Sequence, residues 1–321
     1  MPPPPDSAAP GDAAQLLHQL EWTVIRRLDG LLHGDYRTLF RGPGLDLADL
    51  REYQYQDDVR HIDWNVTARL QTPYVREYNE DRDLTAWFLL DLSASQTFGS
   101  QVQKLSVATS FVTVLSRLLT RHGNRVGALL YGNKVDTVLP PKSSRQHVLH
   151  LMHLLMNRPP PQPGATDLAT LINEANRSIP RRGLVFVISD FITQPGWEAA
   201  LGRLTQRHEV IAVRLYDPLE VELPDIGLMW MQDPETGEQL FVDTHDKGFR
   251  RRYAKLAAER EEVLREGLAA AGVDTLELAT DDDLAEAISR FADLRRSRSR
   301  LSGGAVTRPK SDVTAHLEAR T

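Results

Sequence analysis

The stretch Ala86-Trp87-Phe88-Leu89-Leu90-Asp91-Leu92-Ser93-Ala94-Ser95 joins a continuous apolar run to an acid and two hydroxyls at alternate positions. An apolar run without polar alternation is typical of a strand that is buried on both faces of a sheet. A carboxylate and two hydroxyls placed where such a strand ends can direct three oxygens toward one point. Oxygen ligands of this kind favour a hard cation such as Mg²⁺. The stretch therefore predicts a buried strand over 86–90 and a candidate metal site at Asp91, Ser93 and Ser95.

Near-continuous apolar runs recur along the chain from residue 84, and segments with helical spacing separate them. Because strands that alternate with helices form parallel sheets covered on both faces, the expected fold class is α/β, with a mostly parallel sheet flanked by helices. Further buried strands are expected at 126–131, 184–188 and 210–215. The helices between them are expected at about 102–121, 144–157, 167–178 and 195–207.

The sequence after these strands predicts a hairpin, a long helix and a final strand and helix. The hairpin is indicated by two apolar runs on either side of a turn that contains Pro and Gly. The helix that follows is long and rich in charged residues. These elements are expected at 229–232 with 239–242, at about 246–271, at 275–278 and at 281–294.

The chain divides into four regions by composition. Residues 1–12 are rich in Pro and Ala, so we expect them to be disordered. Residues 13–83 combine a helix near 15–28 with a charged, aromatic-rich segment, and residues 84–294 form the α/β domain. Residues 295–321 begin with a basic stretch, Arg295–Arg300, and are expected to be a disordered, solvated tail.

Composition excludes several classes of protein. The 321 residues include no cysteine, which excludes disulfides, thiolate zinc sites and cysteine nucleophiles and fits a cytoplasmic protein. A net charge of -6 gives no reason to expect nucleic acid as the main partner. The longest apolar runs are about five residues, against roughly 20 for a membrane span, so we expect no membrane insertion. No phosphate-binding loop ending in Lys-Ser or Lys-Thr is present, so the chain itself is not expected to hydrolyse nucleotides.

Two further segments bring oxygens to the place where Asp91 is expected. Asp190 follows the apolar run 184–188, and Thr166 lies in a glycine-containing loop just before an expected helix. In an open parallel sheet, ligands bind outside the carboxyl ends of the strands. We therefore expect Thr166 and Asp190 to belong to the same site as Asp91. The plainer interpretation, that these residues only form turns and a helix cap, stays open at this point.

Together these positions resemble the metal-ion-dependent adhesion site of von Willebrand factor A-type domains. The pattern of that family is Asp-x-Ser-x-Ser, then a Thr in a Gly-rich loop, then an Asp after a later strand. The resemblance implies a von Willebrand A-like (Rossmann-like) fold and a bound Mg²⁺ or Mn²⁺, although degenerate members keep the geometry without the ion. It also implies that the hydroxyls bind the ion directly and that an acidic side chain of a partner protein completes the coordination. The implied metal ligands are Asp91, Ser93, Ser95, Thr166 and Asp190.

The segment before the sheet carries a second resemblance. Residues 49–64, Asp-Leu-Arg-Glu-Tyr-Gln-Tyr-Gln-Asp-Asp-Val-Arg-His-Ile-Asp-Trp, are similar to the signature of a bacterial family, domain-of-unknown-function family fifty-eight. The likeness covers residues 13–290, with Gln56 where the family usually has Gly and Gln96 where it often has Met. Members are commonly encoded beside MoxR-type AAA ATPases. The resemblance therefore implies such an ATPase as partner, in chaperone-like complex assembly or maturation.

This charged segment can act in two ways. Mixed charges among aromatic residues can form an ion-pair network that folds the segment onto the sheet domain. They can also form a protein-binding surface, because Arg, Tyr and Trp are frequent at binding hot spots. Nothing places a nucleophile or a pocket beside its acid pair, so we do not expect catalysis here. The candidate partner-binding residues are Arg51, Tyr53, Asp57, Asp58, Arg60, Asp63, Trp64 and Arg69.

The residues favour a non-enzymatic protein–protein interaction module, because oxygens meet at strand ends with no nucleophile near them. Two alternatives remain at this point. A metal-dependent phosphoesterase-type hydrolase also uses aspartates at strand ends, although Ser93 and Ser95 stand where it would need acids. The second alternative is a structural adaptor with a non-functional metal site.

His147, His150 and His153 recur every third residue, which is more typical of an amphipathic helix than of a metal site.

Overall fold

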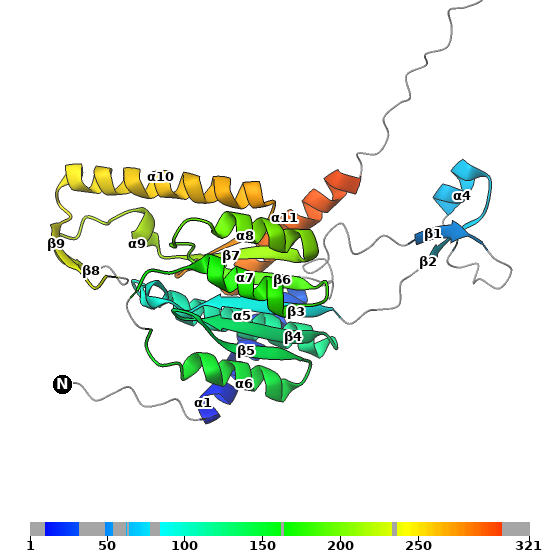
Figure 1. Cartoon of the computed structure of the whole chain (residues 1–321), viewed down its shortest axis with the longest axis horizontal. Helices are drawn as coiled ribbons and strands as arrows, with labels where there is room; N and C mark the ends of the chain where they lie inside the picture. The colour runs from blue at the N-terminus through cyan, green and yellow to red at the C-terminus, as the bar shows by residue number, and fades with distance from the viewer. Residues whose placement is uncertain are drawn as a thin grey trace, which may run out of the picture.

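The computed structural model describes residues 10–31, 49–53, 62, 64–77, 84–161, 164–232 and 236–303. Its centre is a six-stranded sheet with the strand order β10-β7-β6-β3-β4-β5 (Figure 1). Neighbouring strands are parallel except for the pair β4 and β5. The expected fold class, α/β with a mostly parallel sheet flanked by helices, is confirmed. The strands are β3 Thr85–Asp91, β4 Arg125–Tyr131, β5 Val135–Lys142, β6 Leu184–Ser189, β7 Glu209–Tyr216 and β10 Asp274–Ala279.

The edge strand β5 is the element of the sheet that the sequence did not indicate. It pairs antiparallel with β4, and most of its side chains are exposed or half-buried. It also contains Pro140 and Pro141, and proline is tolerated in sheets only at edges and bulges. An exposed strand with two prolines lacks the continuous apolar run by which four of the five other strands are recognised.

One face of the sheet packs against the helices that begin and end the described chain. Side chains at alternate strand positions, such as Phe88 on β3 and Phe186 on β6, form this core, with ring centroids 5.1 Å apart. Phe111 of the covering helix meets Phe186 edge-on at 6.1 Å. The elements on this face are α1 Pro10–Leu20, η1 Glu21–Ile25, α2 Arg26–Leu31, α5 Lys104–Arg121, α6 Arg145–Met156 and α11 Leu284–Gly303.

The opposite face of the sheet packs against three helices. Trp87 and Leu89 of β3 point to this side, because successive side chains of a strand alternate between faces. The long helix α10 runs across the outside of this layer (Figure 1). The helices are α7 Leu168–Ser178, α8 Trp197–Arg207 and α10 Lys247–Ala271. Two helical layers around a sheet thus give the β3 strand its nearly complete burial.

The first helix belongs to the sheet domain rather than to a separate segment 13–83. Leu17, Ile25 and Leu28 are completely buried and contact α5, α6 and α11. Glu21 of the π-helical turn η1 forms an ion pair with Arg117 of α5. The boundary expected at residue 84 therefore divides the chain in the wrong place, because the amphipathic helix covers one face of the sheet.

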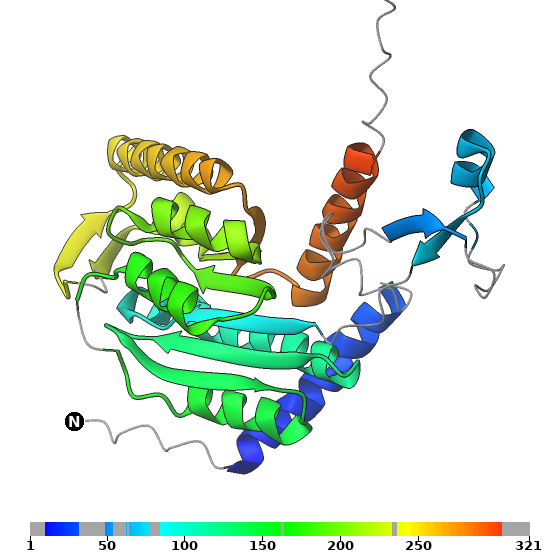
Figure 2. The ribbon, with the colours of Figure 1, turned by 45° about the vertical axis from the view of Figure 1, so that its right-hand side comes forward.

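A small unit formed by β1 Asp49–Glu52, α4 Trp64–Leu70 and β2 Tyr74–Glu77 stands to the side of the sheet domain (Figure 2). Its two strands pair antiparallel, with Asp49 opposite Glu77. The backbone N–H of Tyr74 donates to the hydroxyl of Thr67, which ties the helix to the second strand.

The predicted hairpin is present as β8 Leu228–Gln232 and β9 Gln239–Asp243. Trp230 faces Phe241 across it with ring centroids 4.9 Å apart, and both side chains are exposed. The short helix α9 Pro218–Val221 precedes the hairpin and was not anticipated. A capping box between Asp217 and Glu220 stabilises that single turn.

The last helix continues nine residues beyond the expected end at 294, because it runs to Gly303. Arg295, assigned above to a disordered tail, is buried and forms ion pairs with Glu209 and with Asp274. Both acids lie at the amino ends of neighbouring strands. The tail prediction for 295–303 is therefore corrected, and residues 304–321 lie outside the described part of the chain.

Candidate functional site

The loop after β3 places three of the expected metal ligands at the carboxyl edge of the sheet. Asp91 is the last residue of β3, and Ser93 and Ser95 flank the start of the 3₁₀ turn η3, Ala94–Thr97. All three residues are buried. Oδ1 of Asp91 accepts the backbone N–H of Ser93 at 3.0 Å, and the hydroxyls of Ser93 and Ser95 are 3.2 Å apart. The loop therefore gathers one carboxylate and two hydroxyls, as the sequence predicted.

Asp190 is brought to the same edge because β6 is the direct neighbour of β3. The chain leaves β3 toward β4 on one side, and β6 lies on the other, so the site is at the point where the strand order reverses. Ser189, the last residue of β6, donates its hydroxyl to Oδ2 of Asp91 at 2.6 Å. The end of β6 thus supplies both a candidate ligand and a residue that holds Asp91. Sequence reasoning missed Ser189, which ends an otherwise apolar strand.

Thr166 is also buried at this edge, and two hydrogen bonds connect its loop to the loop after Asp190. Its carbonyl oxygen accepts the hydroxyl of Thr193 at 2.8 Å and the backbone N–H of Gln194 at 2.9 Å. The next residue, Asp167, caps α7, and its N–H donates to the hydroxyl of Tyr131 at 3.0 Å. Tyr131 is paired with Asp91 in the sheet. The helix cap is therefore Asp167 rather than Thr166.

Lys104 is a charged residue of the site that sequence reasoning missed. It begins α5, is completely buried, and lies 2.6 Å from Oδ2 of Asp190 and 2.7 Å from Oε1 of Glu220. A lysine at the start of a helix gives no signal that it is buried. Glu220 belongs to α9, so this ion pair joins the site to the segment after β7.

Asp91 is a completely buried carboxyl group next to a second acid, Asp190. Burial raises the pKa of Asp91 to about 6, and the charge of Asp190 adds to the rise. Hydrogen bonds from Ser189 and Ser93 act in the opposite direction. A cation placed near the two carboxylates would relieve this repulsion.

The donor set fits a hard cation, since it consists of carboxylates and hydroxyls without nitrogen or sulfur ligands. Among the described residues, no three His, Cys, Asp or Glu side chains gather closely enough to hold a metal ion by themselves. Any ion here must therefore be held largely by hydroxyls. Gln96 directs its amide nitrogen toward Asp91, with Nε2 3.4 Å from Oδ2, and its buried Oε1 atom has no hydrogen-bond partner.

The candidate partner-binding segment is only partly described. Trp64 and Arg69 lie on α4, and both are exposed, whereas Tyr53 at the end of β1 is half-buried. Arg51 lies within β1. The remaining candidates fall outside the described residues: Asp57, Asp58, Arg60 and Asp63. The exposed tryptophan and arginine leave the protein-binding interpretation open.

A cavity of about 710 Å³ opens beside Asp190. It lies between the loop after β6 and the helices α8, α9 and α10, and its walls are mostly apolar with charged residues among them. Glu220, which bonds to Lys104, also borders it. Lining residues include Phe191, Trp197, Ala257 and Leu264. The candidate metal site and this cavity therefore share one wall.

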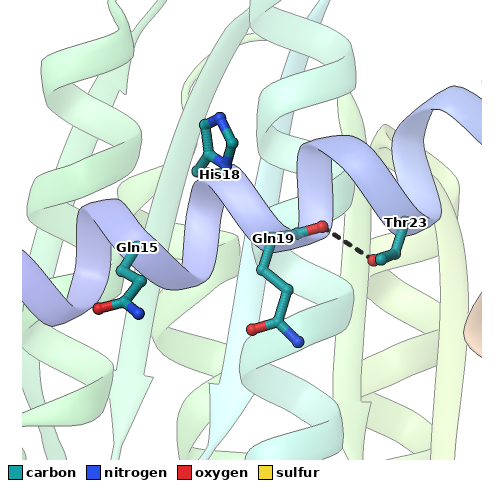
Figure 3. Close-up of a pocket in the computed structure, with 4 residues that line it drawn as sticks. All are labelled: Gln15, His18, Gln19 and Thr23. Carbon is teal, nitrogen blue, oxygen red and sulfur yellow. Dashed lines mark hydrogen bonds between the residues drawn. The ribbon is translucent and has the colours of Figure 1, made fainter.

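A second hollow of about 540 Å³ runs along α1 and η1 (Figure 3). Gln15, His18, Gln19 and Thr23 line it, and the hydroxyl of Thr23 donates to the carbonyl oxygen of Gln19 at 2.9 Å. Gln15 and Gln19 point to one side of the helix and His18 to the other. These side chains do not converge, so we assign no ligand to this surface.

The histidines at 147, 150 and 153 lie on α6, as expected for an amphipathic helix. Nε2 of His147 lies 2.8 Å from the carbonyl oxygen of Val126. His153 Nδ1 lies 2.9 Å from the side-chain amide of Asn157. Two of the three rings thus have partners within the protein.

The strand order, the single antiparallel edge strand and the Asp-x-Ser-x-Ser loop at the switch point define a von Willebrand A-like α/β domain. The chain belongs to the family described as protein of unknown function DUF58, which matches residues 49–263. This is the family that the resemblance of residues 49–64 implied.

Two relatives, one of similar length and one about half as long, are 37% and 38% identical to this chain over the aligned residues. "Uncharacterized protein Rv1480" of Mycobacterium tuberculosis is 37% identical over 292 residues, covering 90% of this chain and 92% of the relative. "Uncharacterized protein MAV169" of Mycobacterium avium is 38% identical over 168 residues, covering 52% and 98%.

Solved structures with some likeness include conserved hypothetical protein BatB from Bacteroides thetaiotaomicron and the SpRpn10 VWA domain. The first has a TM-score of 0.45 at 18% identity and covers 67% of this chain and 99% of its own. The second has a TM-score of 0.37 at 13% identity and covers 64% and 94%. In the described residues, none of the helices combines the length and apolar character required to cross a bilayer.

Proposed function

We propose that the protein is a non-enzymatic protein-binding module whose carboxyl-edge site holds Mg²⁺ or Mn²⁺. The ion would be held by Asp91, Ser93, Ser95, Thr166 and Asp190, and an acidic side chain of a partner protein would complete its coordination. The observation that carries the proposal is the convergence of buried oxygens from three loops at the switch point of the sheet.

The chemistry of the ligands supports recognition rather than catalysis. When bound, the ion supplies a positive charge that hydroxyl ligands leave largely unneutralised, so an outside carboxylate is attracted to it. The chain's own residues fix the geometry: Ser189 holds Asp91, and the loop around Thr193 holds the backbone of Thr166. Among the described side chains next to Asp91, we find hydroxyls and an amide but none paired with a histidine base as in a nucleophilic site.

The partner we propose is a MoxR-type AAA ATPase, which the family resemblance implies. The module would serve this ATPase in chaperone-like assembly or maturation of protein complexes, in the cytoplasm. A cysteine-free chain is compatible with a reducing compartment. The exposed Trp64 and Arg69 of the small N-terminal unit would offer a second contact to the partner.

Calorimetry with Mn²⁺ and Mg²⁺ tests the metal. The full chain should bind one ion, and Asp91→Ala should abolish binding. Asp167→Ala is the matched control, since it removes a neighbouring carboxylate that caps α7 and is not a proposed ligand. Equal, negligible heats for the wild type and Asp91→Ala would refute the metal site and leave a structural adaptor.

A purified MoxR-type ATPase from the same genome tests the partner. Binding to the immobilised chain should be lost in EDTA and restored by Mg²⁺. Binding that is unchanged by EDTA would contradict the role of the ion, and no binding in either condition would contradict the choice of partner.

A further inference from the structure

Lys104 is a buried cation placed directly against one of the proposed metal ligands. Its Nζ atom lies 2.6 Å from Oδ2 of Asp190 and 2.7 Å from Oε1 of Glu220, and its side chain is 0% exposed. The ammonium also lies 5.9 Å from the centre of the Phe98 ring. Two carboxylates and an aromatic face thus surround a positive charge in the interior.

The position is unfavourable for a lysine unless its charge has a role. Lys104 is the first residue of α5, where the helix dipole repels a cation. Its ammonium lies within hydrogen-bonding distance of the carboxylates of Asp190 and Glu220, and two adjacent negative charges favour the charged form of a lysine. The ammonium therefore stays charged, although an apolar residue would fill the same space without loss of hydration.

The partners of Asp190 show what this charge does. Oδ2 of Asp190 accepts a hydrogen bond from Lys104, and Oδ1 accepts the backbone N–H of Ile192 at 3.1 Å. Both oxygens of the carboxylate therefore have partners within the protein. Because Lys104 is completely buried, its ammonium cannot meet an acid of another protein at the surface. Its effect on the site must pass through Asp190.

We infer that Lys104 is an internal counter-ion that restrains Asp190 and thereby limits how tightly the site binds a divalent cation. This inference rests on the proposed metal site and assigns to it a positioning residue. A cation that used Oδ2 of Asp190 would lie close to the ammonium, and like charges repel strongly away from water. An ion at this site would therefore be held mainly by Asp91 and by the hydroxyls of Ser93, Ser95 and Thr166, and less by Asp190. It keeps more of its charge for a carboxylate of the partner.

Metal affinity of full-length variants tests the inference. Lys104→Met keeps the length of the side chain and removes its charge, so Oδ2 of Asp190 becomes free for the ion. The dissociation constant for Mn²⁺, measured by calorimetry and by the electron paramagnetic resonance signal of free Mn²⁺, should fall about tenfold or more. Lys104→Arg keeps the charge and should stay near the wild-type value.

Arg295→Met is the matched control for stability. Arg295 is also a buried cation between two acids, Glu209 and Asp274, but it lies at the amino ends of the strands. Its replacement should destabilise the fold without changing the affinity for Mn²⁺. If Lys104→Met does not fold, the double variant Lys104→Met with Glu220→Gln removes one of the two acids left unpaired and should show the same gain in affinity.

The outcomes separate this inference from the proposed function. A tighter site in Lys104→Met and an unchanged site in Arg295→Met support the inference. Equal Mn²⁺ binding by Lys104→Met and the wild type, or weaker binding by the variant, overturns it while the metal site stands. No Mn²⁺ binding by any of the proteins overturns both.

Discussion

The hydroxyl of Ser189 donates a 2.6 Å hydrogen bond to Oδ2 of Asp91, so the last residue of β6 is bonded to the last residue of β3. The same hydroxyl oxygen accepts the backbone N–H of Phe191 at 2.9 Å. Phe191 has a φ of 57°, a left-handed conformation that is uncommon for a residue with a side chain. One buried hydroxyl therefore fixes the first candidate ligand and the loop that carries the last one.

Ser189→Ala should lower the free energy of unfolding by about 1–3 kcal/mol, since it leaves a buried N–H without its acceptor and a carboxylate without one donor. Denaturation in urea measures the change. Ser178→Ala is the control, because the Ser178 hydroxyl bonds to Glu174 on the outer side of α7 and its loss should cost less than about 0.5 kcal/mol. Equal effects of the two substitutions would show that Ser189 does not position the site.

Gln96→Met should stabilise the metal-free protein by about 1 kcal/mol. The Oε1 atom of Gln96 is buried without a partner, and its amide nitrogen reaches Oδ2 of Asp91 only at 3.4 Å. Replacing an unsatisfied buried amide by an apolar side chain of similar size removes a desolvation cost and loses one weak hydrogen bond. Thermal unfolding in EDTA checks the sign. A lower melting temperature for Gln96→Met would show that the amide bond to Asp91 outweighs the unpaired oxygen.

Buried strands could be predicted from the sequence. Buried basic residues that pair with acids far away in the chain could not. Continuous apolar runs located four strands, and strand ends located Asp91 and Asp190 at one edge. Lys104 and Arg295 were missed or misassigned, because a basic residue near a helix end looks solvent-exposed when its acids are far away in the chain. The acids that bury Arg295 are Glu209 and Asp274, which become its neighbours only after the sheet has formed.

Asp217→Ala should lower the free energy of unfolding by about 2–4 kcal/mol at neutral pH. Asp217 is completely buried, and its carboxylate accepts hydrogen bonds from Ser100, Leu219 and Thr280. These bonds join the end of β7 to the loop before α5 and to the end of β10. Asp136→Ala, which removes a more exposed ion pair with Arg158, should cost no more than about 1 kcal/mol.

The same aspartate gives a pH dependence with a defined direction. Burial acts to raise the pKa of Asp217, but hydrogen bonds from Thr280, Ser100 and Leu219 outweigh it and lower that pKa below its ordinary value. The carboxylate of Asp217 therefore contributes fully to the free energy of unfolding above the ordinary pKa of an aspartate, about 4. This contribution is lost as the pH falls through the lowered pKa of the folded state. The difference in stability between wild type and Asp217→Ala should shrink between neutral pH and the most acidic pH at which the protein is folded. A constant difference would contradict the hydrogen-bonded carboxylate.

A chain that ends at residue 303 should be more stable than one that ends at residue 294 by about 3–5 kcal/mol, the usual effect of breaking a buried ion pair. The shorter chain lacks Arg295 and leaves Glu209 and Asp274 without their cation. Urea denaturation of the two truncated proteins measures the difference. If both proteins unfold at the same urea concentration, residues 295–303 do not stabilise the fold, and the prediction that they belong to a disordered tail would be correct.

His208 should make the protein less stable at mildly acidic pH. Its ring is buried, and neither nitrogen has a hydrogen-bond partner. Burial lowers the pKa of His208, and the charges of Arg207 and Arg182 lower it further. The unfolded chain, with an ordinary histidine pKa of about 6.5, therefore binds a proton that the folded chain does not. Protonation of His208 therefore does not lower the free energy of unfolding above the ordinary histidine pKa. Below it, the free energy of unfolding falls as the pH decreases toward the lower pKa of the folded state.

His208→Leu should raise stability at pH about 7, because two unsatisfied nitrogens disappear, and should flatten its decline below pH about 6.5. His147 acts in the same direction, because burial also lowers its pKa. Asp91 acts in the opposite direction over the same pH range, because burial raises its pKa to about 6, so the comparison is made between the variant and the wild type. His18→Leu, at an exposed position on α1, is the control for replacing a histidine by leucine. Measuring the free energy of unfolding of each protein at several pH values from about 5 to 8 tests this prediction. A slope that His208→Leu does not change would mean that buried water or a structural adjustment satisfies the ring in the folded protein.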